Sequence, residues 1–198
     1  LFGCDAVQID LEDAVPYSEK DAARILVRRF LENYKERNKE ILVRINALDT
    51  KWALDDLKAV LPALPDGIRL PKADSPEIVE RLDTLLTEYE EELGLEVGHF
   101  RILPSIETAQ GVINAVQTAR ASSRLIGLAF GAEDYVTTME IERTKVGEEL
   151  FNARMNVLWG AKAAGIQAID SIFADVNDME GLRHETELIK RLGFTGKC

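Results

Sequence analysis

Cysteine is almost absent from this sequence, since its 198 residues include only Cys4 and Cys198. Two thiols so far apart indicate neither a disulfide framework nor a thiolate metal site. Long apolar runs are missing as well: none approaches the roughly 20 residues that a membrane helix needs, and no signal peptide opens the sequence. We therefore expect a cytoplasmic protein that has no role in a membrane.

Basic residues are also in deficit, with 24 Lys and Arg against 35 Asp and Glu and a formal net charge of −11. Because phosphate backbones are bound through basic patches, nucleic acid is not an expected partner. An anionic substrate would have to bind through local cations or a metal ion. Histidine is scarce too, and His99 and His184 fall in a predicted loop and a predicted helix, where solvated positions are expected.

Short apolar runs alternate with longer amphipathic segments along the chain. The runs that we predict to be strands are 6–11, 41–45, 67–70, 101–106, 125–130 and 166–173, with another beginning at residue 193. Most of them are continuously apolar, which is typical of parallel strands covered on both faces. Their starts are about 31 residues apart on average, which is the step of a (β/α)8 barrel, although a doubly wound open sheet has a similar step.

Seven strand starts fall short of the eight units of a complete barrel. An open, incomplete barrel would expose sheet edges and part of its core. Either the natural protein is longer at both ends or the fold is not a barrel, and we favour the first. We thus predict that residues 1–198 form a single α/β domain, a TIM-type (β/α)8 barrel trimmed at both ends.

Residues that favour helix ends mark the segments between the predicted strands. Ser18 is predicted to cap a long helix that runs through Arg37, and Thr108 is predicted to cap the helix that follows it. Gly165 and Gly193 each follow an amphipathic segment, and glycine is a common C-terminal stop. Helices are therefore expected between successive strands.

Polar residues collect directly after the predicted strands. In chain order they are Asp10, Glu12, Asp13, Arg44, Asn46, Lys72, Glu107, Glu133, Asp134, Asp175 and Asn177. Each one alone has an ordinary explanation, because charged residues cap helices and coat loops. Their clustering indicates a site, since a parallel sheet brings its carboxyl ends together around one mouth, where the catalytic groups of barrels lie.

Two of these carboxylates suggest a metal site. Glu107 follows an apolar strand, and Asp134 lies in a segment where Gly131 permits close approach of the backbone. Oxygen ligands from separate strand ends, without histidine nearby, suit Mg²⁺. This ion keeps several waters and uses one or two carboxylates together with substrate oxygens.

Two cations stand out among the polar residues. Arg44 is in an otherwise apolar strand, so its guanidinium must find an anionic partner. That partner is either one of the acidic residues, in a structural ion pair, or a substrate carboxylate, which arginine binds better than lysine. Lys72 raises the rival idea of a Schiff-base lysine in a metal-free aldolase, against the simpler explanation of a salt bridge at the barrel rim.

Several blocks of the sequence resemble the citrate lyase beta-subunit family and related acyl-thioester lyases. The blocks are Asp5–Pro16, Glu19-Lys20, Ala23-Arg24, Val43–Asn46, Leu70–Ala73, Ile106–Thr108, Gly111-Val112, Gly131–Tyr135, Ala163–Asp170, Asp175–Asp178, Glu180-Gly181 and Leu192–Lys197. They follow the family's order over nearly the whole chain, so the resemblance is highly specific for the superfamily. Asn177-Asp178 and Gly193–Lys197 look more like citrate lyase than like malyl-thioester lyases.

The resemblance implies a TIM-type barrel that cleaves a 3-hydroxy-3-carboxyl acyl thioester in reverse Claisen fashion with Mg²⁺. It also implies that the first strand of this barrel and the end of its eighth unit lie outside the chain. Carried over residue by residue, it makes Glu107 and Asp134 the metal ligands, with Glu107 also at the substrate. Arg44 becomes the substrate-binding and catalytic arginine. Glu12 and Asp13 match an acidic pair at the mouth of the site, and either could be the base that accepts the hydroxyl proton.

The resemblance also implies partners. The substrate would be citryl carried by an acyl carrier protein or coenzyme A, and the products would be oxaloacetate and an acetyl thioester. Citrate lyase alpha and carrier-protein subunits are implied, as is a trimeric or hexameric homo-oligomer. Two alternatives stay open: a malyl-, methylmalyl- or citramalyl-CoA lyase, and a non-catalytic assembly subunit that binds an acyl thioester without turning it over.

Overall fold

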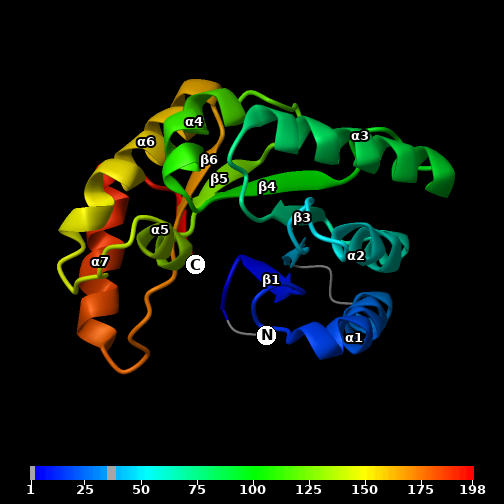
Figure 1. The fold of residues 1–198 in the computed structure, drawn as a ribbon, viewed down its shortest axis with the longest axis horizontal. Coiled ribbons are helices and arrows are strands. Elements are labelled where there is room, and N and C mark those ends of the chain that lie inside the picture. Colours follow the sequence, from blue (N-terminus) through cyan, green and yellow to red (C-terminus); the bar gives the residue numbers. More distant parts are fainter. Residues whose placement is uncertain (1–2, 35–38) are drawn as a thin grey trace. The chain divides into compact units, whose positions relative to one another are not determined.

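The computed structural model describes residues 3–34 and 39–198, where strands alternate with helices (Figure 1). The strands are β1 (Ala6–Asp10), β2 (Glu40–Arg44), β3 (Gly67–Leu70), β4 (Arg101–Ile106), β5 (Gly127–Phe130), β6 (Gln167–Asp170) and β7 (Gly196–Lys197). The α-helices are α1 (Lys20–Asn33), α2 (Ala53–Val60), α3 (Pro76–Leu93), α4 (Ala109–Thr118), α5 (Ala132–Thr138), α6 (Glu148–Ala164) and α7 (Met179–Leu192). Two short 3-10 helices are η1 (Tyr17–Glu19) and η2 (Leu61–Ala63). Each predicted strand is found, and β3 and β4 have the predicted bounds.

The helix ends follow the predicted signals in three of four cases. Oγ1 of Thr108 accepts a hydrogen bond from the N–H of Gly111 at 3.0 Å, which confirms the cap of α4. Gly165 and Gly193 end α6 and α7 with φ angles of 74° and 111°, in the left-handed region that favours glycine. The cap predicted at Ser18 is wrong, because residues 17–19 form η1 and α1 begins after them without a side-chain cap.

Helix α1 ends at Asn33, and Arg37, the predicted end of that helix, lies outside the described residues. The chain forms two compact units. Unit 1 is Leu1–Pro71 with Arg81–Leu103, and unit 2 is Lys72–Glu80 with Pro104–Cys198. The prediction of a single domain is not decided by this division and stays a prediction.

In unit 1, β1 pairs with β2 and β2 with β3, all in parallel. The register sets Asp10 beside Arg44, and Arg44 beside Arg69. Helices α1 and α2 pack against each other, and Nε of the buried Arg24 on α1 donates to Oδ1 of the buried Asp56 on α2 at 2.7 Å. Asp10, Arg44 and Arg69 therefore lie side by side near the carboxyl ends of β1, β2 and β3.

In unit 2, β5 pairs with the end of β4 and with β6, and β6 pairs with β7. Helix α6 packs on β5 and β6 and lies along α4 (Figure 1). The two helices approach closely at Gly160, where a Cβ would lie 2.8 Å from the carbonyl oxygen of Ala115. This close approach packs α4 against α6, the helix that lies on β5 and β6.

The prediction of a TIM-type (β/α)8 barrel is wrong for this structure. The strand order is β1-β2-β3-β4-β5-β6-β7, so β1 and β7 stand at its two ends, and the described residues supply seven strands rather than eight. A closed barrel requires the first and last strands to pair. The predicted repeat of strand and helix is correct, but the same repeat occurs in open α/β sheets, and it could not decide closure.

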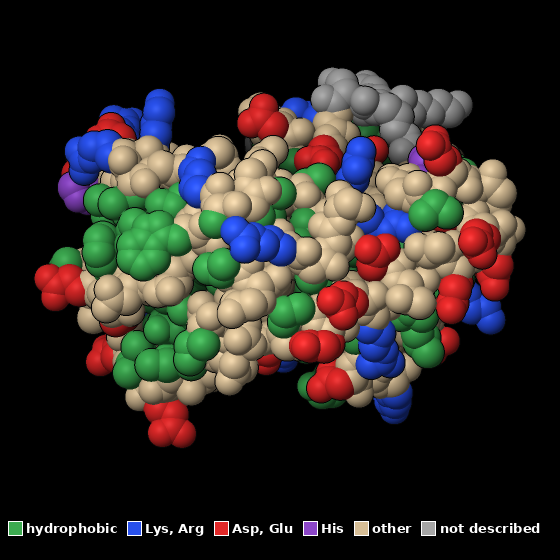
Figure 2. Space-filling model, turned by 90° about the horizontal axis from the view of Figure 1, so that it is seen from above, with side chains coloured by type: hydrophobic (Ala, Val, Ile, Leu, Met, Phe, Trp, Pro, Cys, Tyr) green, Lys and Arg blue, Asp and Glu red, His purple; other side chains and the backbone are tan. Residues whose placement is uncertain are grey.

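The surface of the described residues carries charges of both signs. On the face drawn in Figure 2, Lys and Arg side chains lie interspersed with Asp and Glu. Apolar side chains also gather on part of that face. None of the described helices is long and apolar enough to cross a membrane.

Candidate active site

Arg44 is the centre of an acidic cluster at the end of β2 in unit 1. Its Nε donates to Oδ1 of Asp10 at 2.7 Å and its Nη2 donates to Oδ2 at 2.6 Å, a bidentate geometry that arginine provides and lysine does not. Nη1 lies 3.0 Å from Oε2 of Glu12 and 3.3 Å from Oδ2 of Asp13. The structure therefore brings together the predicted residues Arg44, Glu12 and Asp13, and the ion pair considered for Arg44 is present.

The charges of this cluster stabilise one another. Burial opposes the charged form of Arg44, but hydrogen bonds and charge from Asp10, with the charges of Glu12 and Asp13, raise the pKa of the guanidinium. Burial also opposes ionisation of Asp10, yet the Arg44 guanidinium and the N–H groups of Glu12 and Ala14 hold the pKa of Asp10 below its ordinary value. Three carboxylates around one guanidinium leave the cluster with surplus negative charge.

A buried lysine holds the loop that carries Glu12 and Asp13. Nζ of Lys20 donates to the backbone carbonyl of Leu11 at 2.7 Å and to that of Glu12 at 2.6 Å. Nδ2 of the buried Asn46 donates to the same Leu11 carbonyl at 2.9 Å. These bonds fix the backbone of the loop, while the side chains of Glu12 and Asp13 pair with Arg44.

Arg69 is a buried cation of the same sheet that was not predicted as a site residue. It lies beside Arg44 in the register of β2 and β3, and its Nη1 donates to Oε1 of Gln8. Since side chains two residues apart on a strand share a face, Gln8, Asp10, Arg44 and Arg69 project from one face of β1–β3. The signal that could have found Arg69 is the one that selected Arg44, a charge within an apolar strand.

Glu107 and Asp134 lie at neighbouring strand ends in unit 2. Glu107 directly follows β4 and is only 2% exposed, and Asp134 is half-buried in the first turn of α5, which follows β5. The N–H of Gly131 donates to the Ile106 carbonyl at 2.9 Å, so the start of α5 is tied to the end of β4. The backbone N–H of Lys72 donates to Oε2 of Glu107 at 3.1 Å.

Gly131 provides the space that the Glu107 side chain occupies, which we call the Gly131 seat. A Cβ at position 131 would press against Cγ of Glu107 and come within 2.9 Å of its Oε1, so glycine leaves the room that the carboxylate occupies. Among the described residues, no group of three or more His, Cys, Asp or Glu side chains could hold a metal by itself. Mg²⁺ needs only one or two protein carboxylates and takes its other oxygens from water and substrate, so the predicted pair Glu107 and Asp134 could hold it.

A buried charge network supports the start of α5 from β6. Asp170, at the end of β6, accepts hydrogen bonds from Nε and Nη2 of Arg154 at 2.8 and 3.0 Å and from Nζ of Lys197 at 2.9 Å. Lys197 Nζ also donates to the Ser171 carbonyl at 2.6 Å, and Oγ of Ser171 accepts from the N–H of Ala132 at 3.1 Å. Helix α5, which carries Asp134, is therefore held at its start by Ser171 and the charge network behind it. No local pattern in the sequence links these residues, so their role was not predicted.

The other predicted candidates lie at exposed positions. The Lys72 side chain is exposed, whereas a Schiff-base lysine is usually desolvated, so its setting does not favour a metal-free aldolase. Asp175 and Asn177 lie in the loop after β6, where the N–H of Asn177 donates to Oδ1 of Asp175 at 3.1 Å. Glu133 forms an ion pair with Arg143. The geometry assigns none of these side chains to the metal pair.

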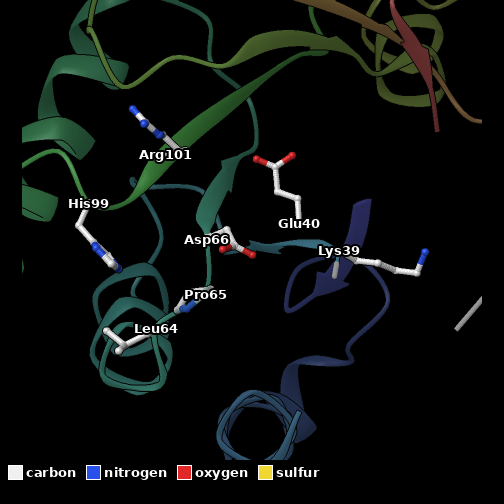
Figure 3. Close-up of a pocket in the computed structure, with 7 residues that line it drawn as sticks. All are labelled: Lys39, Glu40, Leu64, Pro65, Asp66, His99 and Arg101. Atoms are coloured by element: carbon white, nitrogen blue, oxygen red, sulfur yellow. The ribbon is translucent and has the colours of Figure 1, made fainter. Parts of the chain in front are cut away.

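A cavity of about 630 Å³ lies at the other ends of the unit 1 strands (Figure 3). It is lined by Lys39, Glu40, Leu64, Pro65, Asp66, His99 and Arg101. Glu40 and Arg101 begin β2 and β4, so the cavity is at the amino-terminal edge, and none of the predicted catalytic or metal residues lines it. Ligands of parallel α/β sheets bind at the carboxyl ends of the strands, which favours the Arg44 edge. His99 and His184 are both exposed, as predicted.

Comparison with known proteins places the chain among lyases and aldolases. The family model described as HpcH/HpaI aldolase/citrate lyase matches residues 1–198. The citrate lyase subunit beta of Leuconostoc mesenteroides subsp. cremoris is 47% identical over 197 residues, which cover 100% of this chain and 65% of the relative. The mitochondrial citramalyl-CoA lyase of Rattus norvegicus is 30% identical over 203 residues, which cover 98% of this chain and 60% of the relative. The chain thus spans less than two thirds of the length of these two curated relatives.

A solved structure with the same arrangement is the citrate lyase beta subunit complexed with oxaloacetate and magnesium from M. tuberculosis. It is 30% identical to this chain, with a TM-score of 0.79, and the match covers 98% of this chain and 80% of that chain. The similarity therefore extends over nearly all of the present sequence in both sequence and fold.

Proposed function

The chain belongs to the HpcH/HpaI aldolase/citrate lyase family, and we propose that it forms the catalytic part of a Mg²⁺-dependent carbon–carbon lyase. The reaction is cleavage of a citryl thioester, carried by an acyl carrier protein or coenzyme A, to oxaloacetate and an acetyl thioester. The observation that carries this proposal is the buried Glu107 carboxylate in its Gly131 seat, beside the helix that bears Asp134. The 47% identity to a citrate lyase beta subunit supports the choice of substrate.

Glu107 and Asp134 are the residues that would hold Mg²⁺. The bound ion supplies Lewis acidity that lowers the pKa of the substrate hydroxyl and orients it with the adjacent carboxylate. Glu107 suits this role because its Oε2 is fixed by the Lys72 N–H and its side chain is almost fully buried. Its fixed carboxylate also limits where the substrate oxygens can lie.

Arg44 is proposed to bind a substrate carboxylate or the negative charge that develops as the enolate leaves. Of its three partners, Asp13 has the most exposed side chain, at 60%, and the longest contact, at 3.3 Å. An incoming carboxylate therefore displaces Asp13 with the least disruption, while the bidentate bond to Asp10 keeps the guanidinium in place.

Glu12 and Asp13 are the proposed candidates for the base that accepts the hydroxyl proton. When a substrate carboxylate displaces Asp13 from Arg44, the side chain of Asp13 becomes free to act as that base. Glu12 is buried beside the guanidinium, at 3.0 Å, and is held there by the bond from Lys20 to its carbonyl. Of the two, Asp13 has the greater freedom to reach a substrate.

A second candidate is cleavage of a citramalyl-, malyl- or methylmalyl-CoA, which the 30% identity to a citramalyl-CoA lyase favours. The two reactions are separated by product, because the second gives pyruvate or glyoxylate in place of oxaloacetate. A non-catalytic subunit would bind an acyl thioester and release neither product. We further propose a cytoplasmic homo-oligomer, trimeric or hexameric, that works with citrate lyase alpha and carrier-protein subunits, and copurification of these subunits would test it.

The deciding experiment is oxaloacetate release from a citryl thioester by the full-length protein, coupled to malate dehydrogenase. It is run with Mg²⁺, with EDTA, and with Glu107→Gln. We expect release that needs the metal and is lost in the variant. If a folded protein that binds Mg²⁺ releases no oxaloacetate from any citryl thioester, the citrate assignment fails and the citramalyl- or malyl-type substrate takes its place.

A further inference from the structure

Lys72 has an unusual backbone conformation directly beside Glu107. Its φ angle is 50°, in the left-handed region that non-glycine residues rarely adopt. The same residue directs its N–H at Oε2 of Glu107, at 3.1 Å. Its carbonyl accepts from the N–H of Asp74 at 2.9 Å, so the chain turns sharply at this position. The strained residue and the candidate metal ligand are thus joined by a hydrogen bond.

The turn at Lys72 is anchored on both sides of Glu107. The N–H of the buried Ala73 donates to the Ser105 carbonyl at 3.0 Å, two residues before Glu107. Oγ1 of Thr108, the residue after Glu107, donates to Oδ1 of Asp74 at 2.5 Å. These bonds hold the turn against the strand end that carries the carboxylate, and the left-handed Lys72 directly precedes the two residues that make them.

We propose that Lys72 is a positioning residue whose left-handed backbone, and not its ammonium group, holds Glu107 in the orientation that binds a divalent cation. This role rests on the proposed metal site, and it explains what sets the orientation of the Glu107 carboxylate there. The Lys72 N–H fixes Oε2 of Glu107, while Oε1 of the same carboxylate lies beside Gly131, so the plane of the carboxylate is set from two sides. The exposed side chain of Lys72 is consistent with a role that belongs to its main chain.

The proposal predicts that substitutions rank by their tolerance of positive φ and not by charge. Glycine adopts this region freely, asparagine adopts it more readily than most residues, and valine is strongly disfavoured there because its Cβ is branched. Lys72→Gly, Lys72→Asn and Lys72→Val all remove the ammonium group. Any difference among the three therefore reports on the backbone.

The test is a titration of the full-length protein and these variants with Mn²⁺ alone, followed by the loss of the free-ion EPR signal, and with Mg²⁺ by calorimetry. Glu107→Gln serves as the control without the ligand. We expect Lys72→Gly and Lys72→Asn to keep the wild-type Kd within about twofold, and Lys72→Val to weaken it about tenfold, which matches the ~1.4 kcal/mol scale of a strained backbone. Thermal unfolding without metal checks that each variant is folded.

Equal affinity in Lys72→Val and wild type would overturn the inference, as would a loss in Lys72→Asn as large as that in Lys72→Val. If Lys72→Val does not fold, loss of affinity in both Lys72→Gly and Lys72→Asn would show that the ammonium group is needed and would reject the proposal. Failure of the proposed function looks different: wild type and Glu107→Gln would then bind Mn²⁺ alike.

Discussion

At the scale of single residues, Gly131 leaves a space that Glu107 fills. A methyl group there would press on Cγ of Glu107 and lie 2.9 Å from its Oε1. We predict that Gly131→Ala weakens Mn²⁺ binding at least tenfold and lowers the free energy of unfolding by about 1–3 kcal/mol, as overpacking usually does. Gly3→Ala is the matched control, since nothing lies within 4 Å of its Cβ position. If Gly131→Ala and Gly3→Ala changed Mn²⁺ binding and unfolding equally, the space at Gly131 would not be what positions Glu107.

Arg44 pairs with three carboxylates, and its removal takes away the shared cationic partner of the buried ones. Arg44→Met is expected to lower the free energy of unfolding by about 3 kcal/mol, the usual cost of breaking a buried ion pair on one side. Asp13→Asn changes only the exposed partner and is expected to cost less than about 1 kcal/mol. Urea unfolding of both variants measures the difference. A cost in Asp13→Asn as large as in Arg44→Met would show that the cluster is not organised around the bidentate bond to Asp10.

Sequence patterns selected candidate residues whose type was unusual for their position. Arg44 stands out because a charge in an apolar strand demands a partner, and that partner was found within the predicted acidic loop. Lys72 was noticed for its ammonium group, while its structural contribution comes from the backbone. Ser171 was not predicted, because its contact with Ala132 joins positions 39 residues apart that no local pattern connects.

At the scale of secondary structure, the cap of α4 stands directly beside the candidate metal ligand. Thr108 accepts a bond from the Gly111 N–H and donates to Asp74, so it joins the helix start to the turn at Lys72. We predict that Thr108→Ala lowers the free energy of unfolding by about 1 kcal/mol, a typical loss for an N-cap. Thr108→Ser keeps the hydroxyl and is expected to stay near wild type. Chemical denaturation compares them, and equal losses would exclude capping as the cause.

Helix and strand identities followed from the chain's apolar pattern, while exact boundaries depended on contacts that the pattern does not contain. Strand β7 begins at Gly196 and not at Gly193, because the N–H groups of Gly193 and Phe194 donate to the Ile189 carbonyl and finish the end of α7. Ser18 could not act as the predicted cap because the chain first makes a 3-10 turn over residues 17–19. Both differences arise at helix ends, where alternative hydrogen bonds compete.

At the scale of the whole molecule, stability in acid depends on the buried network around Glu185. Burial opposes its ionisation, but hydrogen bonds from Lys197 and Arg154 hold the pKa of Glu185 below its ordinary value of 4.5. A lowered folded-state pKa stabilises the protein above pH 4.5, and this contribution is lost as the pH falls through the folded-state value.

We therefore predict that Glu185→Gln lowers the Tm at neutral pH and flattens the fall of Tm below pH 4.5. Glu32→Gln is the matched control, because that carboxylate is half-exposed and pairs only with Arg28 among the interactions of the described residues. Thermal unfolding at pH 3 to 7 measures both variants. A wild-type slope in Glu185→Gln would show that other carboxylates carry the acid sensitivity.

Closure of the sheet is the whole-molecule property that the sequence did not predict correctly. The repeat of strand and helix was evident from apolar runs, and each βα step was found. Whether β1 and β7 pair depends on strand number and stagger, which are set by long-range geometry and not by any segment's composition. The prediction failed there because an open order and a closed one share the same local signals.

A stacked aromatic pair beside the acidic loop provides an intrinsic fluorescence probe. Tyr17 and Trp52 stack with ring centroids 4.8 Å apart and planes inclined by 6°, and Nζ of Lys20 lies 5.8 Å from the Trp52 ring. That ammonium group is also bonded to the carbonyls of the loop that carries Glu12. We expect a substrate that displaces Asp13 from Arg44 to change the surroundings of this ammonium group, so that the emission of Trp52 would report binding without any added dye.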